Sequence, residues 1–219
     1  SPLLANIYLH EVLDVWFEEE VRPQLAGPAF LCRYADDFVI VCTDQIDARW
    51  AMSLMTERFG SYGLTLHPDK TRLVPFHAPL EDSDDDEPGS FDLLGFTHFW
   101  GKSRKGSYVV QRKTARGRFA RAVKAVAAWC RRVRHLPIPE QHKKLSRKLK
   151  GHYGYYGITG NSSSLQRFLH EVTRVWKKWL GTRSRAAEKS WGWFHDLLER
   201  YPLPPPIAVH SKLRRAANL

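Results

Sequence analysis

The sequence is poor in cysteine and in long apolar segments, and each shortage excludes a class of protein. Its three cysteines, Cys32, Cys42 and Cys130, form neither a disulfide framework nor a zinc pattern. This usage fits a reducing compartment, so we expect a cytoplasmic protein that is not secreted. Apolar runs such as residues 38–42 have only about five residues, far short of the ~20 that a membrane helix needs. We therefore expect no membrane partner.

Basic residues and a starting methionine are both missing from the N-terminus. The first twenty residues hold five acids and no Lys or Arg, so they do not form a signal-peptide pattern. The chain begins with Ser rather than Met, and we expect it to be a piece of a longer protein. No internal repeat is visible.

What the chain does contain is enough apolar material for a folded core. Hydrophobic residues make up 43% of its 219 residues and aromatic residues 12%, so wholesale disorder is not expected. This length suits one domain or two small ones.

Charge is divided very unevenly along the chain. Residues 1–90 hold six Lys or Arg and seventeen Asp or Glu, a net charge of −11. Residues 91–219 hold twenty-eight Lys or Arg and six Asp or Glu, a net charge of +22. Such a basic half repels itself unless a polyanion neutralises it, so nucleic acid is the first partner we expect. The alternative is a basic, solvated surface without a ligand.

Hydrophobic periodicity predicts a mixed structure at the N-terminal end. Residues 3–21 have the apolar spacing of an amphipathic helix. Residues 30–34 and 38–43 are short β-rich runs, which predict a tight hairpin with Asp36 and Asp37 at its turn. A second helix is expected at about 46–62.

The next segments predict short strands and an insertion. We expect strands at 64–66 and 71–76, and a hairpin formed by 91–100 and 108–111. The acidic run at 81–87 is more typical of a mobile surface insertion than of a metal site, because adjacent like charges repel and extend the chain.

From Thr114 the pattern becomes helical and basic. Helices are predicted from about 114, over 140–151, from Ser162–Ser164 through Leu180, and near 188–201, followed by a proline-rich tail at 202–206. Gly151 to Gly157 is expected to end the second of these helices. The fold class is therefore α+β to about residue 113, followed by an all-helical module.

The most chemically informative segment is Tyr34-Ala-Asp-Asp37. Adjacent carboxylates at a hairpin apex are costly unless water or a cation faces them. Mg²⁺ prefers hard oxygen ligands, and polymerases hold two such ions about 3.5–4 Å apart. Alone, an Asp-Asp pair is also ordinary turn chemistry.

Four motifs in order give this pair a context. They are Ser1-Pro-Leu-Leu-Ala-Asn-Ile-Tyr-Leu9, Tyr34-Ala-Asp-Asp37, Gly63-Leu-Thr-Leu-His-Pro-Asp-Lys-Thr71 and Leu93-Leu-Gly-Phe96. Their order and gaps resemble the palm of reverse transcriptases, most closely the group II intron-encoded reverse transcriptase/maturases. The following helices, with Leu149-Lys-Gly-His-Tyr-Gly-Tyr-Tyr-Gly157, resemble the maturase-specific thumb of that family.

The resemblance implies a fold and a division into domains. It implies a partial right-hand polymerase palm, an antiparallel sheet with helices, over residues 1–113. A helical thumb or maturase-specific domain over 114–182 would follow, and then a C-terminal helix and tail over 183–219.

The resemblance also implies a role for each matching residue. Asp36 would be a direct metal ligand and Asp37 the second acid for two Mg²⁺ ions. Lys70 would lie near the phosphates of a deoxynucleoside triphosphate, or be an ordinary surface residue. Nucleotide and template contacts are implied for Ser1, Pro2, Asn6, Tyr34 and Ala35, and a primer grip for Leu94, Gly95 and Phe96.

The basic helices are expected to hold structured, group II intron-like RNA and the RNA–DNA hybrid. The residues proposed for this binding are Arg116, Arg121, Lys124, Arg131, Arg132, Lys143, Lys144, Arg147, Lys148, Lys150, Tyr153 and Tyr156. Tyr155 and Trp193 are further candidates for base stacking, whereas Trp176 and Trp179 fit the inward stripe of their helix.

Two departures from the family shape the functional hypothesis. The family has another catalytic aspartate and a finger domain upstream, and neither is found here; a segment on the same or a separate chain would supply them. We therefore expect the isolated chain to be inactive as a polymerase. No Cys pairs or His cluster of an HNH endonuclease follow the thumb. The alternatives are a non-catalytic RNA-binding maturase remnant and a domesticated or CRISPR-associated relative.

Overall fold

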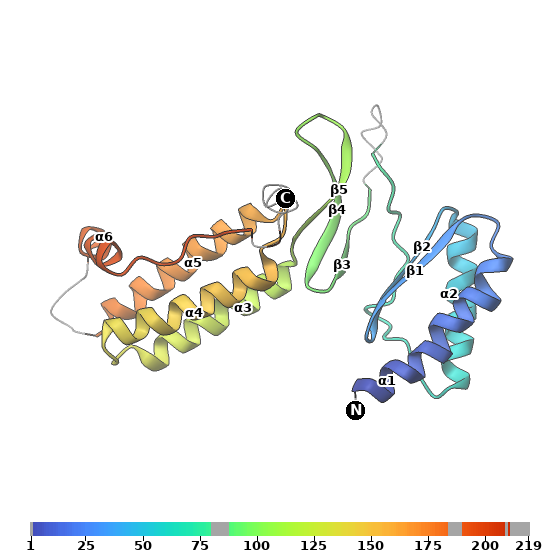
Figure 1. Cartoon of the computed structure of the whole chain (residues 1–219), viewed down its shortest axis with the longest axis horizontal. Coiled ribbons are helices and arrows are strands. Elements are labelled where there is room, and N and C mark those ends of the chain that lie inside the picture. The colour runs from blue at the N-terminus through green and yellow to red at the C-terminus, as the bar shows by residue number, and fades with distance from the viewer. Residues whose placement is uncertain (1, 80–87, 184–189, 209, 211–219) are drawn as a thin grey trace, which may run out of the picture. The chain divides into compact units, whose positions relative to one another are not determined.

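A computed structural model describes residues 2–79, 88–183, 190–208 and 210 of the chain. The chain forms two compact units, Ser1–Leu94 and Gly95–Leu219, called here the first and the second unit. Both contain helices, and each contains an antiparallel β-hairpin, so the α+β class is confirmed (Figure 1). No helix in the described ranges is both long and apolar enough to span a bilayer.

The first unit begins with one continuous helical segment, as the periodicity at 3–21 predicts. It consists of α1 (Pro2–Leu9), two π-helical stretches (His10–Val15 and Phe17–Val21) and a short 3₁₀ turn (Arg22–Gln24). The buried side chains of this segment come from the π-helical stretches and from Trp16 between them, whereas α1 buries none.

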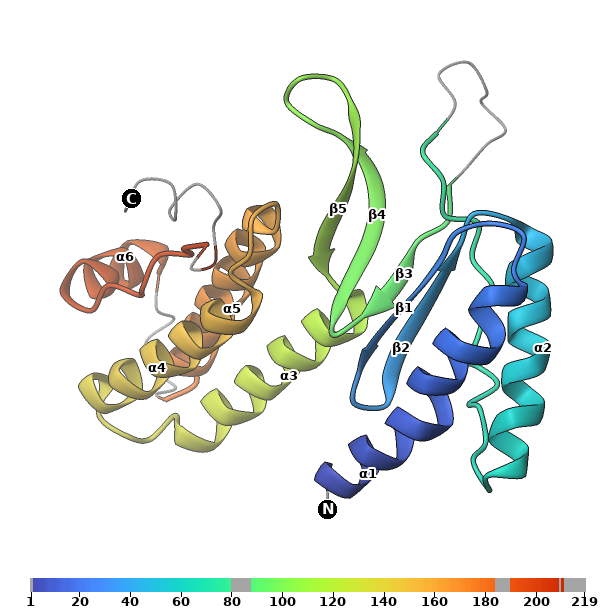
Figure 2. The ribbon, with the colours of Figure 1, turned by 45° about the vertical axis from the view of Figure 1, so that its right-hand side comes forward.

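The predicted hairpin follows and packs with a second helix. Strands β1 (Ala29–Tyr34) and β2 (Asp37–Cys42) are antiparallel, in register from Ala29↔Cys42 to Tyr34↔Asp37. Helix α2 (Gln45–Ser61) starts where the Asp44 carboxylate accepts hydrogen bonds from two backbone N–H groups of its first turn. Figure 2 shows the N-terminal helix and α2 running along the hairpin, where their apolar sides form the core.

The strands predicted at 64–66 and 71–76 do not form. His67 accepts backbone hydrogen bonds from Lys70 and Thr71 at 3.1 and 2.9 Å, which makes a turn, and Pro75 offers no N–H to a ladder. The unit closes with β3 (Phe91–Leu93). The acidic run 81–87 lies outside the described residues; of the expected loop 80–89, only Pro88 and Gly89 are described.

The second unit joins a long hairpin to a helical bundle. It contains β4 (Phe96–Lys102), β5 (Tyr108–Thr114), α3 (Arg116–Val133), α4 (Ile138–Tyr156), α5 (Ser162–Gly181) and α6 (Trp191–Arg200). Trp176 and Leu180 of α5 are fully buried in its core, as the stripe predicted for this helix requires, and Phe194 of α6 is buried with them. The prediction that Gly151 to Gly157 ends α4 is wrong for most of that segment, because the helix continues to Tyr156 and buries Tyr153.

The β4–β5 hairpin belongs to the second unit, together with the helices, and not to the first unit. The buried Asn161 accepts a hydrogen bond from the Thr114 backbone N–H and donates to the Thr114 hydroxyl and to the Tyr156 carbonyl, all at 2.9 Å. These bonds fasten the end of β5 to both α4 and α5. The boundary between the two units lies between Leu94 and Gly95, earlier than the boundary expected near residue 113. The assignment of functional domains to 1–113, 114–182 and 183–219 stays a prediction.

Candidate active site

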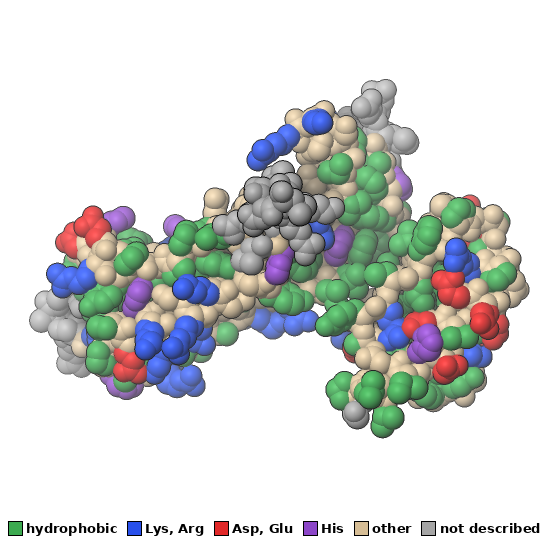
Figure 3. Space-filling model, viewed as in Figure 1, with side chains coloured by type: hydrophobic (Ala, Val, Ile, Leu, Met, Phe, Trp, Pro, Cys, Tyr) green, Lys and Arg blue, Asp and Glu red, His purple; other side chains and the backbone are tan. Residues whose placement is uncertain are grey.

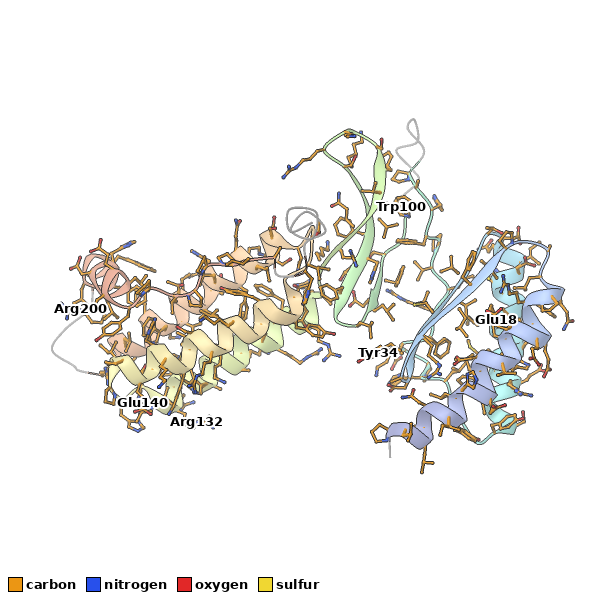
Figure 4. All side chains as sticks on the ribbon, viewed as in Figure 1. Glu18, Tyr34, Trp100, Arg132, Glu140 and Arg200 are labelled. Carbon is orange, nitrogen blue, oxygen red and sulfur yellow. The ribbon has the colours of Figure 1, made fainter. Side chains whose placement is uncertain are left out.

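The β1–β2 turn holds the two predicted metal ligands in the open. Ala35 and Asp36 form the turn, and Asp37 is the first residue of β2, opposite Tyr34; the expectation that both acids lie in the turn is corrected to this extent. Both carboxylates are exposed, and Tyr34 is 68% exposed beside them at the end of β1 (Figure 4). Ala35 has φ = 54°, a conformation that costs a non-glycine residue roughly 1 kcal/mol or more.

Arg33 ties this turn to the N-terminal helix. Its guanidinium donates from Nε and Nη2 to the two oxygens of Asp14, at 2.7 and 2.5 Å. Its Nη1 donates to the carbonyl of Ala35 and to Oδ1 of Asn6, each at 3.0 Å. The Arg33 side chain is only 13% exposed, so this bidentate pair is partly shielded from water. One side chain thus fixes the strained residue that directly precedes Asp36.

The electrostatics of this network are consistent with its geometry. Hydrogen bonds from Arg33 hold the pKa of the Asp14 carboxyl below its ordinary value, although burial acts in the opposite direction. The same bonds raise the pKa of Arg33. His10 lies one turn before Asp14, with Nδ1 at 3.3 Å from Oδ2. Asp14 is therefore a charged anchor, and the sequence pattern gave no signal for it.

The N-terminal residues predicted to touch nucleotide and template are accessible where they are described. Pro2 and Asn6 are exposed on α1, and Asn6 is held by Arg33. Tyr8 of the same motif donates a hydrogen bond to the Tyr62 carbonyl at 2.7 Å. Ser1 lies outside the described residues. The structure therefore links Asn6 to the hairpin turn.

Lys70 is placed in the turn that follows α2. Its side chain is exposed, and within the described ranges no hydrogen bond or ion pair joins it to Asp36 or Asp37. Its role at a nucleotide stays a prediction. A cavity of about 870 Å³ in this unit lies between α2 and residues 73–77, and neither Asp36 nor Asp37 lines it.

The predicted primer-grip residues form a tight turn at the start of β4. Leu94 and Gly95 both have positive φ, 51° and 80°. A Cβ on Gly95 would meet the Tyr156 hydroxyl at 3.1 Å, and the Gly95 carbonyl accepts from the Ala115 N–H at 2.9 Å. Phe96 stacks on Tyr155 with ring centroids 6.0 Å apart. Gly95 and Phe96 are thus packed against the ends of α3 and α4, and at position 95 only glycine avoids both backbone strain and a close contact with Tyr156.

The basic residues predicted to bind RNA are exposed on α3 and α4. They are Arg116, Arg121, Lys124, Arg131, Arg132, Lys143, Lys144, Arg147, Lys148 and Lys150. Figure 3 shows Lys and Arg side chains gathered on one side of these helices. Lys144 pairs with Glu140 at 2.5 Å, so part of its charge is already neutralised.

The aromatic candidates are divided by burial. Tyr153 is 3% exposed and donates to the Pro204 carbonyl at 3.3 Å, so its predicted stacking on a base is corrected to a core role. Burial raises its pKa to about 12. Tyr156 is half-buried against Phe96. Tyr155 is 55% exposed and is the most accessible of these three rings. The signal that sequence reasoning missed is the i, i+4 spacing that puts Leu149 and Tyr153 on one buried face.

The turn offers the type of ligand atom that Mg²⁺ prefers, but only two side chains provide it. Two exposed carboxylates offer the hard oxygens that Mg²⁺ prefers, with its remaining positions left for water and phosphate. Within the described residues no third acid, cysteine or histidine joins them to make a closed metal cluster. The described turn is therefore an open, partial ligand set.

Comparison with known proteins addresses only the first part of the chain. The model of the family described as "Reverse transcriptase (RNA-dependent DNA polymerase)" matches residues 1–98, and no curated protein matches the chain. The matched region contains the Tyr34–Asp37 turn, Lys70 and the Leu94–Phe96 turn, but leaves out the helical bundle. Residues 1–98 therefore carry the sequence pattern of a reverse transcriptase domain.

Proposed function

We propose that this chain is the palm and thumb portion of an RNA-directed DNA polymerase of the group II intron type, which also binds intron-like RNA. The observation that supports this most is the exposed Asp36–Asp37 pair on a hairpin held by Arg33, inside the region that matches the reverse transcriptase model. Its substrates are deoxynucleoside triphosphates and an RNA template with a DNA primer. A cytoplasmic location stays part of this proposal.

The residues of the turn have distinct tasks in this proposal. Mg²⁺, when bound, activates the primer 3′-oxygen and stabilises the leaving pyrophosphate. Asp36 and Asp37 hold the ions. Arg33 keeps the turn in its strained conformation, so that the carboxylates need no rearrangement when substrate arrives. Lys70 faces the triphosphate and supplies positive charge there.

The basic second unit supports the polymerase by holding the duplex. Its exposed Lys and Arg neutralise phosphates without reading sequence, which suits an enzyme that copies any template. Gly95 and Phe96 contact the primer end, and Tyr155 stacks on an unpaired base.

The alternative is a protein that binds RNA without polymerising. Its specific support is the partial ligand set, since two carboxylates are fewer than a two-metal site uses. The two functions differ in what Asp36 does, so one substitution separates them.

The test is primer extension by the polypeptide encoded by the complete reading frame that contains these residues. We expect Asp36→Asn to abolish DNA synthesis on an RNA template while RNA affinity stays within a few-fold. Asp196→Asn, at an exposed aspartate of α6, is the matched control and should keep full activity. Synthesis that survives Asp36→Asn would remove the metal-ligand role; no synthesis by the unsubstituted protein would favour the RNA-binding alternative.

A further inference from the structure

The β4–β5 hairpin combines a rigid turn with unpaired positive charge. Ser103 donates a backbone hydrogen bond to Ser107 at 2.8 Å, and Gly106, with φ = 86°, donates to Ser103 at 3.0 Å. These bonds define the loop that carries Arg104 and Lys105. Both side chains are exposed, and Figure 3 shows Lys and Arg at the end of this hairpin.

Charge on the hairpin is of one sign. Residues 96–114 contain five Lys or Arg and no Asp or Glu. None of the five forms an ion pair with a carboxylate in the parts of the chain that the structure describes. They are Lys102, Arg104, Lys105, Arg112 and Lys113. Because no carboxylate neutralises these five side chains within the described residues, the hairpin attracts negatively charged partners.

Two of these lysines are supported by rings of the facing strand. Lys102 Nζ lies 5.4 Å from the centre of the Tyr108 ring, and Lys113 Nζ lies 4.6 Å from that of Phe99. A cation held over an aromatic face loses less freedom when it binds a phosphate than a free lysine does. In the strand register Lys102 is paired with Tyr108. Arg112 lies four residues beyond Tyr108 on β5, roughly 14 Å from it at ~3.4 Å per residue, so the cations are spread along the hairpin.

We propose, on the basis of the function above, that the β4–β5 hairpin is a phosphate-binding element for an A-form duplex, separate from the helices α3 and α4. A β-hairpin with cations at its tip and along its stem suits the wide, shallow minor groove of an A-form helix, whose borders are phosphates and whose floor exposes 2′-hydroxyls. The tip residues are Arg104 and Lys105, and the stem residues are Lys102, Arg112 and Lys113.

The competing explanation is that the charges only protect the sheet. Strand β5 has one neighbouring strand, β4, and Val109 and Val110 are exposed on it. Lysine on such an edge discourages pairing with other chains. Charge reversal separates the two explanations, because glutamate also protects an edge but repels phosphate.

The experiment measures binding of the full chain to an RNA–DNA hybrid, an RNA stem and single-stranded RNA of equal length, without Mg²⁺ or nucleotide. Arg104→Glu/Lys105→Glu is compared with Lys178→Glu/Arg200→Glu, which makes the same change in net charge at exposed positions on α5 and α6. Arg104→Gln/Lys105→Gln is the milder second variant. Sedimentation and circular dichroism check that all variants stay folded and do not associate.

We expect the tip variant to lose at least tenfold affinity for the two duplexes at 50 mM salt, and the control less than threefold. The slope of log K against log salt should decrease by about 1.8, the value for two phosphates, in the tip variant alone. The glutamine variant should show the same order of loss, and single-stranded RNA should be affected less. If only the affinity for the RNA–DNA hybrid falls, the hairpin binds the duplex that DNA synthesis produces. If the affinity for the RNA stem falls equally, the hairpin binds double-stranded RNA as well.

Equal effects of the tip and control variants would overturn the inference, since the cations would then act only through the general field of the unit. An unsubstituted chain that binds no duplex at 50 mM salt would overturn it together with the RNA-binding part of the proposed function. A failure of DNA synthesis in the primer-extension test would leave the hairpin result standing.

Discussion

The two units use different forces to hold their functional groups. In the first unit the carboxylate turn depends on directional polar contacts, with one guanidinium joining Asp14, Asn6 and the Ala35 carbonyl. In the second unit exposed cations surround an apolar interior in which Trp176 is fully buried and donates to Gln141. A polar network fixes geometry at short range, whereas a packed bundle tolerates changes on its surface. We therefore expect function to fail before folding in the first unit, and surface charge to be separable from folding in the second.

The largest effect that would sharpen this comparison is expected for Arg33→Lys. Lysine keeps the charge but cannot serve Asp14, Asn6 and the Ala35 carbonyl at once, because its donors lie on a single nitrogen. A displacement of the turn by about 1 Å is enough to lower the rate of a positioned reaction by roughly 100-fold. In the polypeptide encoded by the complete reading frame, we expect DNA synthesis to fall by about 10- to 100-fold, measured by primer extension, with RNA affinity unchanged.

Arg49→Lys provides the matched control, because Arg49 is exposed on α2. It should retain the full rate. If Arg33→Lys also kept the full rate, the guanidinium network would be an ordinary structural contact, and the contrast between the units would lose its functional meaning.

A smaller effect is expected from His152, a partly buried residue of α4 in the second unit. Its ring stacks on Phe168 with centroids 3.7 Å apart, and no hydrogen bond to its Nε2 is found within the described residues. Burial lowers the pKa of His152 from its ordinary value of 6.5 to about 4. Between these values the unfolded chain binds a proton that the folded chain does not, so the free energy of unfolding decreases as pH falls from about 6.5 toward 4.

This loss should amount to about 1–2 kcal/mol, after allowance for the partial exposure of the ring. Urea unfolding at pH 7 and pH 5, followed by far-UV circular dichroism, measures it. His152→Phe should remove most of the difference between the two pH values. An unchanged difference in His152→Phe would show that other groups cause the acid sensitivity.

Local patterns were sufficient for most of the fold. The β-rich runs around residues 34–37 predicted the hairpin, and the apolar stripe ending at Leu180 predicted the buried face of α5. Glycine misled the prediction for α4, because burying Leu149 and Tyr153 outweighs a cost of about 1 kcal/mol for each helical glycine. The strands expected at 64–66 and 71–76 failed for the opposite reason, since apolar β-formers do not make a strand without a partner ladder.

The candidate site was predictable in its chemistry but not in its support. Asp36 and Asp37 stand out because adjacent acids in a turn are visible in any sequence. Arg33 is 19 residues from Asp14 and 27 residues from Asn6 along the chain, so only the folded structure brings the three together. Tyr153 and Tyr155 look alike in the sequence, and helix packing alone decides that one is buried and the other exposed.

The central claim, that Asp36 and Asp37 gather divalent ions, is tested most directly by counting bound ions. Mn²⁺ replaces Mg²⁺ as a paramagnetic probe, and electron paramagnetic resonance measures free Mn²⁺ in the presence of RNA–DNA primer–template and a non-reacting nucleotide. We predict that Asp36→Asn/Asp37→Asn binds markedly less Mn²⁺ than the unsubstituted protein, whereas Glu57→Gln/Asp196→Asn, at exposed acids on α2 and α6, binds as much. Equal Mn²⁺ binding by all three proteins would contradict the account.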